Sequence, residues 1–303
     1  MPSLETNLGK LLKLKNPLIL ASGINDSNAA SLIRGAKDGA GAVTSKSCNV
    51  KGRKGHDPPV LISNEHYILN AMGLPNPGAE KMRDELALAV KECAKLGVPV
   101  IASVFGESAE EFAEAAQIVA EAKPALIEAD ISCPNTMNKT FFSDKPESVS
   151  AVTRAMKNAT KIPISVKLAP NVPSLSLLAK AAEDAGADCI TAINTMPGMA
   201  IDPIARRPIL TNKVGGMSGP ALKPISLRCV YEISRAVKIP IIGTGGIITG
   251  SDAAEMLVAG ASAVGVGSAF YYRRNSFKLI AEELEKVMKE NGCSKISDLR
   301  FQE

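Results

Sequence analysis

From about residue 17 onward, the chain alternates short apolar runs with longer amphipathic stretches. The runs are rich in Val, Ile, Leu and Ala, which is typical of strands buried in a parallel sheet. The stretches between them are Ala-rich and place apolar residues at helical spacing, as in 110–120, 175–185 and 226–236. The pattern predicts eight strands, within residues 17–21, 42–46, 98–103, 125–130, 163–167, 189–194, 239–243 and 263–267.

Eight β/α units in one chain predict an α/β fold, a (β/α)8 TIM barrel in which residues 1–303 form a single domain. An open doubly wound sheet is the alternative, and the regular repeat without a clear switch point favours the barrel. Residues 1–16 show weak apolar alternation and predict a short N-terminal hairpin that closes one end of the domain. Two connections, about 47–77 and 195–223, are too long for simple turns, so we expect long functional loops on the catalytic face.

Composition excludes several functional classes. The net charge is a mild +4, and no basic run with interleaved aromatic residues suggests nucleic-acid binding. No apolar stretch reaches about 18 residues, and no signal peptide precedes the first strand, so neither a membrane partner nor secretion is expected. The six cysteines form no C-x-x-C pair, which argues against a metal or iron–sulfur site within the chain and suits a cytoplasmic enzyme with reduced thiols.

The fourth predicted strand runs into a polar loop that carries a cysteine. Glu128, Asp130 and Ser132 alternate and therefore share one face of the strand. Acidic side chains are seldom fully buried unless they are paired or used. Cys133 follows, with Asn135 two residues later. A barrel places its chemistry just past the carboxyl ends of its strands, so we interpret Cys133 as the catalytic base of a flavin enzyme.

The other strand ends are also polar. Gly243–Gly246 follows strand seven and Gly265–Ser268 follows strand eight, where barrels commonly hold a phosphate. Two ligand-free glycine turns are the less favoured alternative. Lys46 and Lys167 each close an apolar strand, and two lysines in one pocket favour an anion such as a phosphate or a reduced flavin over two snorkelling side chains. The segment 70–76 is equally well a turn or part of the site.

Motifs along nearly the whole chain resemble those of the class 1 dihydroorotate dehydrogenases, FMN enzymes of pyrimidine biosynthesis. The motifs are specific in their order and spacing. They are Ala21-Ser22-Gly23, Thr44-Ser-Lys-Ser47, Asn70-Ala-Met-Gly-Leu74, Ser132-Cys-Pro-Asn135, Val166-Lys-Leu168, Ile193-Asn-Thr195, Gly215-Gly-Met-Ser-Gly219, Gly245-Gly246 and Gly267-Ser268.

The resemblance implies the oxidation of dihydroorotate to orotate. Cys133 matches the base that removes the C5 proton while C6 passes a hydride to flavin N5, and Lys46 matches the lysine beside the flavin and the substrate. The implied substrate-binding residues are Lys46, Asn70, Met72, Gly73, Leu74, Asp130, Asn135, Asn194 and Thr195. The implied FMN-binding residues are Ser22, Lys46, Ser47, Ser103, Asp130, Lys167, Ile193, Gly219, Gly245, Gly246, Gly267 and Ser268.

The chain departs from the family pattern near the substrate. Asp130 and Ser103 stand where the family usually has Asn, the loop 136–144 replaces a Gly-Gly loop, and 51–59 lacks an Arg-x-Gly-Asn run. An ionised Asp130 only accepts hydrogen bonds and would repel a substrate carboxylate. An FMN oxidoreductase for another pyrimidine or an enone-like ring is therefore the second hypothesis. A non-redox phosphate-binding barrel, such as an isomerase or aldolase, is the third.

The segment 194–199, together with 215–219, looks most like the NAD-linked class 1 type. Catalytic chains of that type pair with a second subunit that carries FAD and an iron–sulfur cluster. The resemblance thus implies a homodimer that can associate with such an electron-transfer subunit. The fumarate-using homodimeric type is the alternative. The membrane-linked class 2 relatives differ, because they use serine in place of Cys133.

Overall fold

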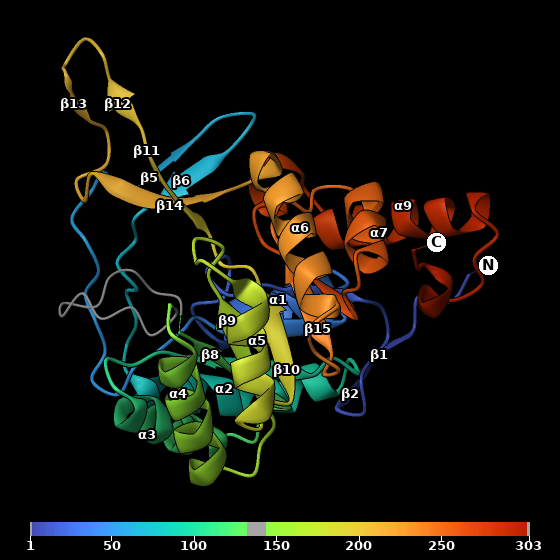
Figure 1. Ribbon diagram of the computed structural model, residues 1–303, viewed down its shortest axis with the longest axis horizontal. Helices are drawn as coiled ribbons and strands as arrows, with labels where there is room; N and C mark the ends of the chain where they lie inside the picture. The colour runs from blue at the N-terminus through green and yellow to red at the C-terminus, as the bar shows by residue number, and fades with distance from the viewer. Residues whose placement is uncertain (1, 132–143, 302–303) are drawn as a thin grey trace.

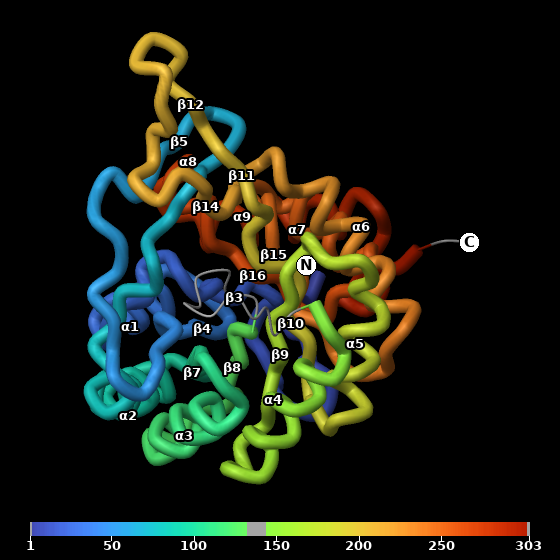
Figure 2. Tube along the Cα trace, turned by 60° about the vertical axis from the view of Figure 1, so that its left-hand side comes forward, coloured from blue at the N-terminus to red at the C-terminus, as the bar shows by residue number. Residues whose placement is uncertain are grey.

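The computed structural model describes residues 2–131 and 144–301, and its central feature is a closed parallel barrel (Figures 1 and 2). The strands follow one another around the barrel in chain order, and the last pairs with the first. They are β3 (Leu18–Leu20), β4 (Ala42–Thr44), β7 (Val100–Val104), β8 (Leu126–Asp130), β9 (Ile164–Leu168), β10 (Cys189–Ala192), β15 (Ile241–Thr244) and β16 (Ala263–Val266). Each of these strands overlaps one of the eight predicted runs, so the predicted TIM barrel is confirmed.

Helices surround the barrel and bury one face each against it. The helix α9 (Ser276–Glu290) illustrates the cause, because its buried residues Phe277, Ile280, Leu284 and Met288 recur at helical spacing. The other helices are α1 (Ala29–Lys37), α2 (Ala79–Ala94), α3 (Ala109–Ala120), α4 (Pro146–Ala159), α5 (Leu175–Asp184), α6 (Lys223–Ser234), α7 (Gly250–Val258) and α8 (Ala269–Tyr272), with short 3₁₀ turns at Pro220–Leu222 and Ile296–Asp298. No helix in residues 2–131 and 144–301 is long and apolar enough to cross a membrane.

The predicted N-terminal hairpin is also confirmed. Strands β1 (Thr6–Leu8) and β2 (Leu12–Leu14) pair in antiparallel fashion. Leu8 and Leu14 are fully buried, in one cluster with Ile19, Ile101 and other inward-facing residues of the barrel strands. The hairpin therefore plugs the amino-terminal end of the barrel and leaves the opposite end for the site.

Shortening a buried side chain of the N-terminal hairpin is expected to destabilise the fold. Leu14→Ala removes a fully buried side chain, and we expect the free energy of unfolding to fall by about 2–5 kcal/mol. Urea denaturation monitored by circular dichroism would measure the change. Leu177→Ala is the matched control, because Leu177 is 63% exposed on α5 and its loss should cost less than about 0.5 kcal/mol. Equal losses in the two variants would contradict the role of the hairpin as a plug.

The two long loops meet each other above the carboxyl end of the barrel. Strand β6 (Ile68–Asn70) of the first loop pairs with β14 (Val214–Ser218) of the second. With β5 (Leu61–Ser63) and β11 (Met196–Met199) they form a four-stranded antiparallel sheet. The sequence predicted two long loops on this face but did not predict that they pair with each other.

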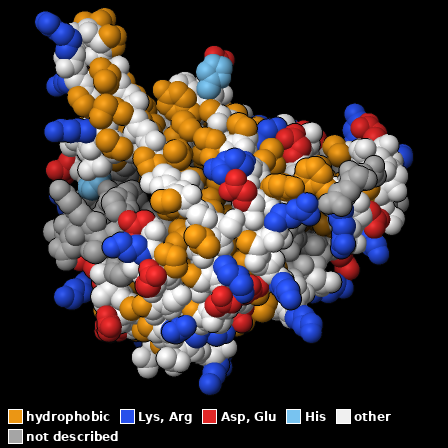
Figure 3. Space-filling view, viewed as in Figure 1, with side chains coloured by type: hydrophobic (Ala, Val, Ile, Leu, Met, Phe, Trp, Pro, Cys, Tyr) orange, Lys and Arg blue, Asp and Glu red, His pale blue; other side chains and the backbone are white. Residues whose placement is uncertain are grey.

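A further hairpin, β12 (Ile201–Asp202) with β13 (Arg207–Pro208), projects from the four-stranded sheet at the top left of Figure 1. Its side chains include the exposed Ile201 and Ile204, and Figure 3 shows apolar side chains along the projection, with Lys and Arg near its tip. Apolar residues exposed on a projection are typical of a contact surface.

Candidate active site

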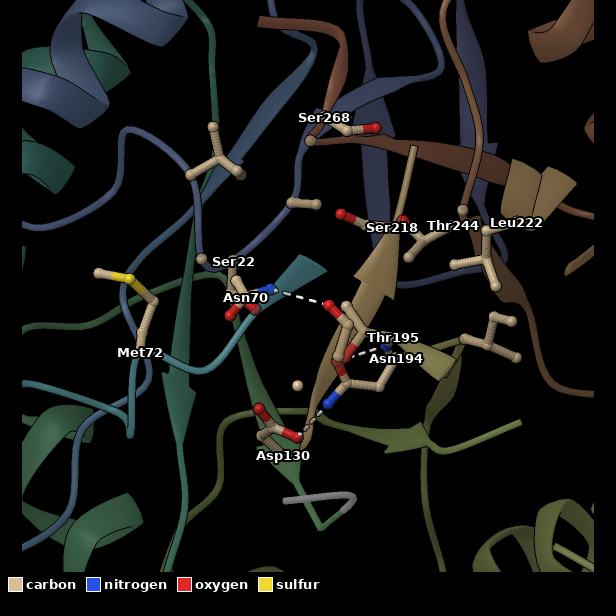
Figure 4. Close-up of a pocket in the computed structure, with 18 of the residues that line it drawn as sticks. Ser22, Asn70, Met72, Asp130, Asn194, Thr195, Ser218, Leu222, Thr244 and Ser268 are labelled. Atoms are coloured by element: carbon tan, nitrogen blue, oxygen red, sulfur yellow. Dashed lines mark hydrogen bonds between the residues drawn. The ribbon is translucent and has the colours of Figure 1, made fainter. Parts of the chain in front are cut away.

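A pocket of about 370 Å³ opens at the carboxyl end of the barrel, beneath the four-stranded sheet (Figure 4). Strand ends supply one wall, and the two long loops supply the other. Most of the residues predicted to bind substrate or cofactor line this one pocket. They are Ser22, Lys46, Ser47, Asn70, Met72, Gly73, Leu74, Asp130, Lys167, Ile193, Asn194, Thr195, Gly245, Gly246, Gly267 and Ser268.

Two of the predicted cofactor contacts are not among the lining residues. Ser103 is fully buried on β7, where its hydroxyl lies 2.8 Å from the Ser47 hydroxyl. Gly219 has a φ of +94°, and a Cβ there would lie 2.9 Å from the Tyr272 hydroxyl, so its position suits a tight turn. Cys133 and Asn135 lie outside the described residues, although Asp130, three residues before Cys133, lines the pocket.

Lys167 occupies the centre of a buried polar network under the pocket. Its ammonium donates to the Ser22 hydroxyl at 2.8 Å and lies 3.5 Å from the Glu128 carboxylate. Burial alone would lower the pKa of Lys167, but the neighbouring Glu128 and Asp130 carboxylates outweigh burial and raise that pKa above its ordinary value. Lys167 is therefore an ammonium ion at neutral pH, which suits the binding of an electron-rich or anionic group.

Asp130 is held by the strand ends on either side of it. Its carboxylate accepts a hydrogen bond from the Asn194 side-chain amide at 3.1 Å and a longer one from the Ser47 hydroxyl at 3.5 Å (Figure 4). The Asn194 amide oxygen in turn accepts from the Thr195 backbone N–H at 2.8 Å. Asp130 also pairs in register with Lys167 on the neighbouring strand. The carboxylate thus fixes which way the Asn194 amide faces.

A second buried carboxylate, Asp26, was not predicted as part of the site. It follows β3, is 1% exposed, and accepts a hydrogen bond from the Gly23 backbone N–H. Its backbone oxygen accepts from the Lys46 N–H at 2.9 Å. Burial raises the pKa of Asp26, and the Lys46 ammonium works in the opposite direction. The Gly23 partner is local, but the contact with Lys46 depends on the pairing of β3 with β4, which the local sequence around Asp26 does not reveal.

The turn after β15 brings backbone very close to its neighbours. Gly246 has a φ of +79°, and a Cβ there would lie 2.6 Å from the backbone of Lys223. Thr244, at the end of the same strand, lines the pocket, and its buried hydroxyl has no hydrogen-bond partner in the described part of the chain. Such a hydroxyl is available to form a hydrogen bond with a bound group. With the glycine turns and the two lysines, this donor set fits an anionic cofactor that carries a phosphate.

The cysteines that the structure describes are poor candidates for a base. Burial raises the pKa of the Cys48 and Cys189 thiols to about 12 and also raises those of Cys93 and Cys229. Cys293 lies beyond α9, outside the set of residues that line the pocket. Within the described residues, no group of three or more His, Cys, Asp or Glu side chains could hold a metal ion.

Comparison with known proteins agrees with the sequence motifs. The family model described as dihydroorotate dehydrogenase matches residues 3–288. A protein of Thermococcus kodakarensis is 44% identical over 290 residues, which cover 95% of this chain and 94% of the relative. Proteins of Pyrococcus abyssi and Methanothermobacter thermautotrophicus are 46% and 45% identical, each covering 98% of this chain and 97% of the relative. All three are named dihydroorotate dehydrogenase B (NAD(+)), catalytic subunit. The chain therefore belongs to the dihydroorotate dehydrogenase family of oxidoreductases, as its motifs predicted.

Proposed function

We propose that this chain is the catalytic subunit of an FMN-dependent enzyme that oxidises (S)-dihydroorotate to orotate in pyrimidine biosynthesis. One observation carries the proposal: the lysines, amides and glycine turns predicted from separate strands line a single pocket. Convergence of polar groups at the carboxyl end of a barrel is how this fold builds an active site. A barrel that held only a phosphate would not need the Asn194-Thr195 pair.

The cofactor would lie between the glycine turns and the lysines. Gly245, Gly246, Gly267 and Ser268 would present backbone N–H groups to the FMN phosphate. Lys167, Ser22 and Ser47 would hold the ring system from below. When bound, FMN would supply the acceptor at N5 for the hydride that leaves C6 of the substrate.

The substrate would lie on the loop side of the pocket. Asn70, Met72, Gly73 and Leu74 come from the first long loop, and Asn194 and Thr195 come from the second. Their amides and backbone groups can pair with a ring that carries amide edges. Cys133 would accept the proton from C5, and Asn135 would contact the substrate beside it. The Lys46 ammonium would stabilise the negative charge on the reduced flavin.

Electrons would then leave through a partner. The relatives are named catalytic subunits of an NAD(+)-linked enzyme, so we infer an association with a second subunit that carries FAD and an iron–sulfur cluster. A homodimer of this chain, working in the cytoplasm as one FMN-binding domain, would form the core of the assembly. A fumarate-using homodimer is the alternative.

Asp130 supports a second candidate substrate. The carboxylate lines the pocket and would face the carboxylate of dihydroorotate with like charge. A neutral pyrimidine or enone-like ring with an N–H donor would suit Asp130 better. The contact between Asn194 and Asp130 weakens this argument against dihydroorotate, because one Asp130 oxygen already accepts a hydrogen bond from Asn194.

The visible spectrum of the purified protein, before and after anaerobic addition of dihydroorotate, tests both candidates. A flavin spectrum that bleaches on addition would support the proposed reaction. Flavin that stays oxidised would point to the second substrate class instead. Colourless protein that takes up no added FMN would overturn the cofactor assignment and favour a non-redox barrel.

Asp130→Asn is expected to leave dihydroorotate oxidation within severalfold of the wild type or to improve it. The new amide oxygen can accept from Asn194, and loss of the negative charge should lower KM for an anionic substrate. Steady-state kinetics with an artificial acceptor would measure KM and kcat. Asp202→Asn, on the projecting hairpin, is the control and should change neither. A loss of tenfold or more, roughly 1.4 kcal/mol, would show that the carboxylate has a role of its own.

A further inference from the structure

Glu128 is a buried carboxylate to which the proposed reaction assigns no role. It lies on β8, 4% exposed, below the level of Asp130. One carboxylate oxygen, Oε1, accepts hydrogen bonds from the Ser22 hydroxyl at 3.1 Å and the Ser103 hydroxyl at 3.2 Å. The same oxygen lies 3.5 Å from the Lys167 ammonium. Glu128 is not among the residues that line the pocket, so any effect on a ligand must pass through its neighbours.

The contacts form a closed unit of ammonium, hydroxyl and carboxylate. The Lys167 ammonium donates to the Ser22 hydroxyl, and that hydroxyl donates to Glu128. Lys167 and Ser22 both line the pocket, whereas Glu128 and Ser103 stand behind them. A lysine has three donors, so a direct ion pair and a hydroxyl bridge leave one donor to direct at a ligand.

Lys167 needs a counter-charge because it is buried. Desolvation favours the neutral amine and can move a buried lysine's pKa down by several units, into the neutral range. The charged groups around Lys167 are Glu128 and Asp130 on β8 and Asp26 after β3, and Asp26 also interacts with Lys46. Asp130 is engaged by Asn194, and Asp26 by the backbone of Gly23. Glu128 forms an ion pair with Lys167 at 3.5 Å.

We propose that Glu128 is a positioning residue that keeps Lys167 as an ammonium ion directed into the cofactor pocket. The proposal rests on the proposed function, in which that pocket holds FMN. It assigns Ser22 the role of a bridge and Ser103 the role of holding the Glu128 carboxylate. Glu128 touches neither substrate nor cofactor, so its effect should appear as a change in the charge of Lys167.

The test is the pH profile of FMN binding to the apoprotein. Glu128→Gln keeps the shape and the hydrogen-bond acceptor but removes the charge. We expect its FMN dissociation constant, divided by the wild-type value at each pH, to be near one at about pH 6 and to rise about tenfold by about pH 9. The rise follows because a lysine without its counter-charge loses its proton as the pH increases. Taking the ratio cancels the ionisation of the FMN phosphate.

Two further variants separate this role from a structural one. Glu128→Gln in a Lys167→Met background, compared with Lys167→Met alone, should show no pH-dependent ratio. Ser165→Ala removes a buried hydroxyl beside Glu128 that hydrogen-bonds with the Thr191 hydroxyl at 2.9 Å, whereas Lys167 donates to Ser22, and this variant should give a ratio of FMN dissociation constants that is independent of pH. The proposal would be overturned if Glu128→Gln raised the FMN dissociation constant by the same factor at every pH. It would also be overturned if the increase with pH persisted in the Lys167→Met background.

A measurement on the unsubstituted protein covers the case in which Glu128→Gln does not fold. The side-chain ¹⁵N signal of Lys167, assigned by its loss in Lys167→Met, reports the protonation state directly. We expect the ammonium form throughout about pH 6 to pH 9. A neutral amine within that range would refute the role of Glu128. Failure of the wild-type apoprotein to bind FMN would refute the proposed function instead, because the ¹⁵N measurement does not depend on the cofactor.

Discussion

Cys133→Ala is expected to abolish most dihydroorotate turnover while leaving FMN bound. A general base that removes a carbon-bound proton contributes about 10²–10⁴-fold to the rate, so kcat should fall by at least about a hundredfold. The cofactor should stay because the glycine turns, Lys167, Ser22 and Ser47, which are proposed to hold FMN, belong to other strands and the loops after them. Anaerobic stopped-flow reduction of the bound flavin would isolate this step from reoxidation.

The control for this variant is another cysteine. Cys293→Ala changes a thiol that does not line the pocket and should leave the rate of flavin reduction unchanged. The buried Cys48 and Cys189 are unsuitable as alternative bases, since the pKa of each is raised to about 12 and the thiolate is scarce at neutral pH. Wild-type reduction rates in Cys133→Ala, with flavin bound, would remove Cys133 from the mechanism.

The barrel could be predicted from the sequence because its strands are buried on both faces. A run such as Val100–Val104 is mostly apolar and buried throughout, and the amphipathic helix Ala109–Ala120 that follows it continues the alternation of strand and helix. Boundaries were less certain, since β9 begins one residue later and ends one residue later than the predicted 163–167. The hairpin was predicted from apolar alternation instead, and its Leu8 and Leu14 are buried together in the barrel end.

The sheet formed by the two long loops could not be predicted. Strand β6 at Ile68–Asn70 pairs with β14 at Val214–Ser218, and no local signal connects segments so far apart in the chain. Glycine-rich strands such as β14 also lack the side-chain alternation that would indicate a register. The length of the two loops indicated that they have a function. Their pairing depends on the barrel, which places both loops at the same end of the molecule.

Many of the residues that line the pocket could be predicted one by one, but the contacts between them could not. Strand ends identify Lys46, Lys167 and Asn194, because polar residues there have no place in a packed core. The pairing of Lys167 with Glu128 depends on which faces the neighbouring strands turn inward and on the register that sets Glu128 opposite Ser165. Ser103 shows the same limit, since it closes a strand yet lies behind Ser47 rather than in the pocket.

Gly246→Ala is expected to reduce FMN affinity by at least about a hundredfold, the second large effect. Gly246 has a φ of +79°, which alone costs an alanine about 1–2 kcal/mol. The added Cβ would in addition lie 2.6 Å from the Lys223 backbone, so the turn after β15 must move. Backbone N–H groups bind a phosphate only when they converge on it, and a displaced turn loses that convergence. Fluorescence titration of the apoprotein with FMN would measure the loss.

Gly97→Ala separates the two causes of this loss. Gly97 has a φ of +64°, follows α2 at the other end of the barrel, and has nothing within 4 Å of an added Cβ. It therefore carries the same backbone strain without the collision, and it should lower the melting temperature slightly while leaving FMN affinity intact. A Gly246→Ala protein that binds FMN as tightly as Gly97→Ala would exclude the turn after β15 from the phosphate site. The turn after β16, with Gly267 and Ser268, and the lysine side of the pocket would then have to hold the cofactor.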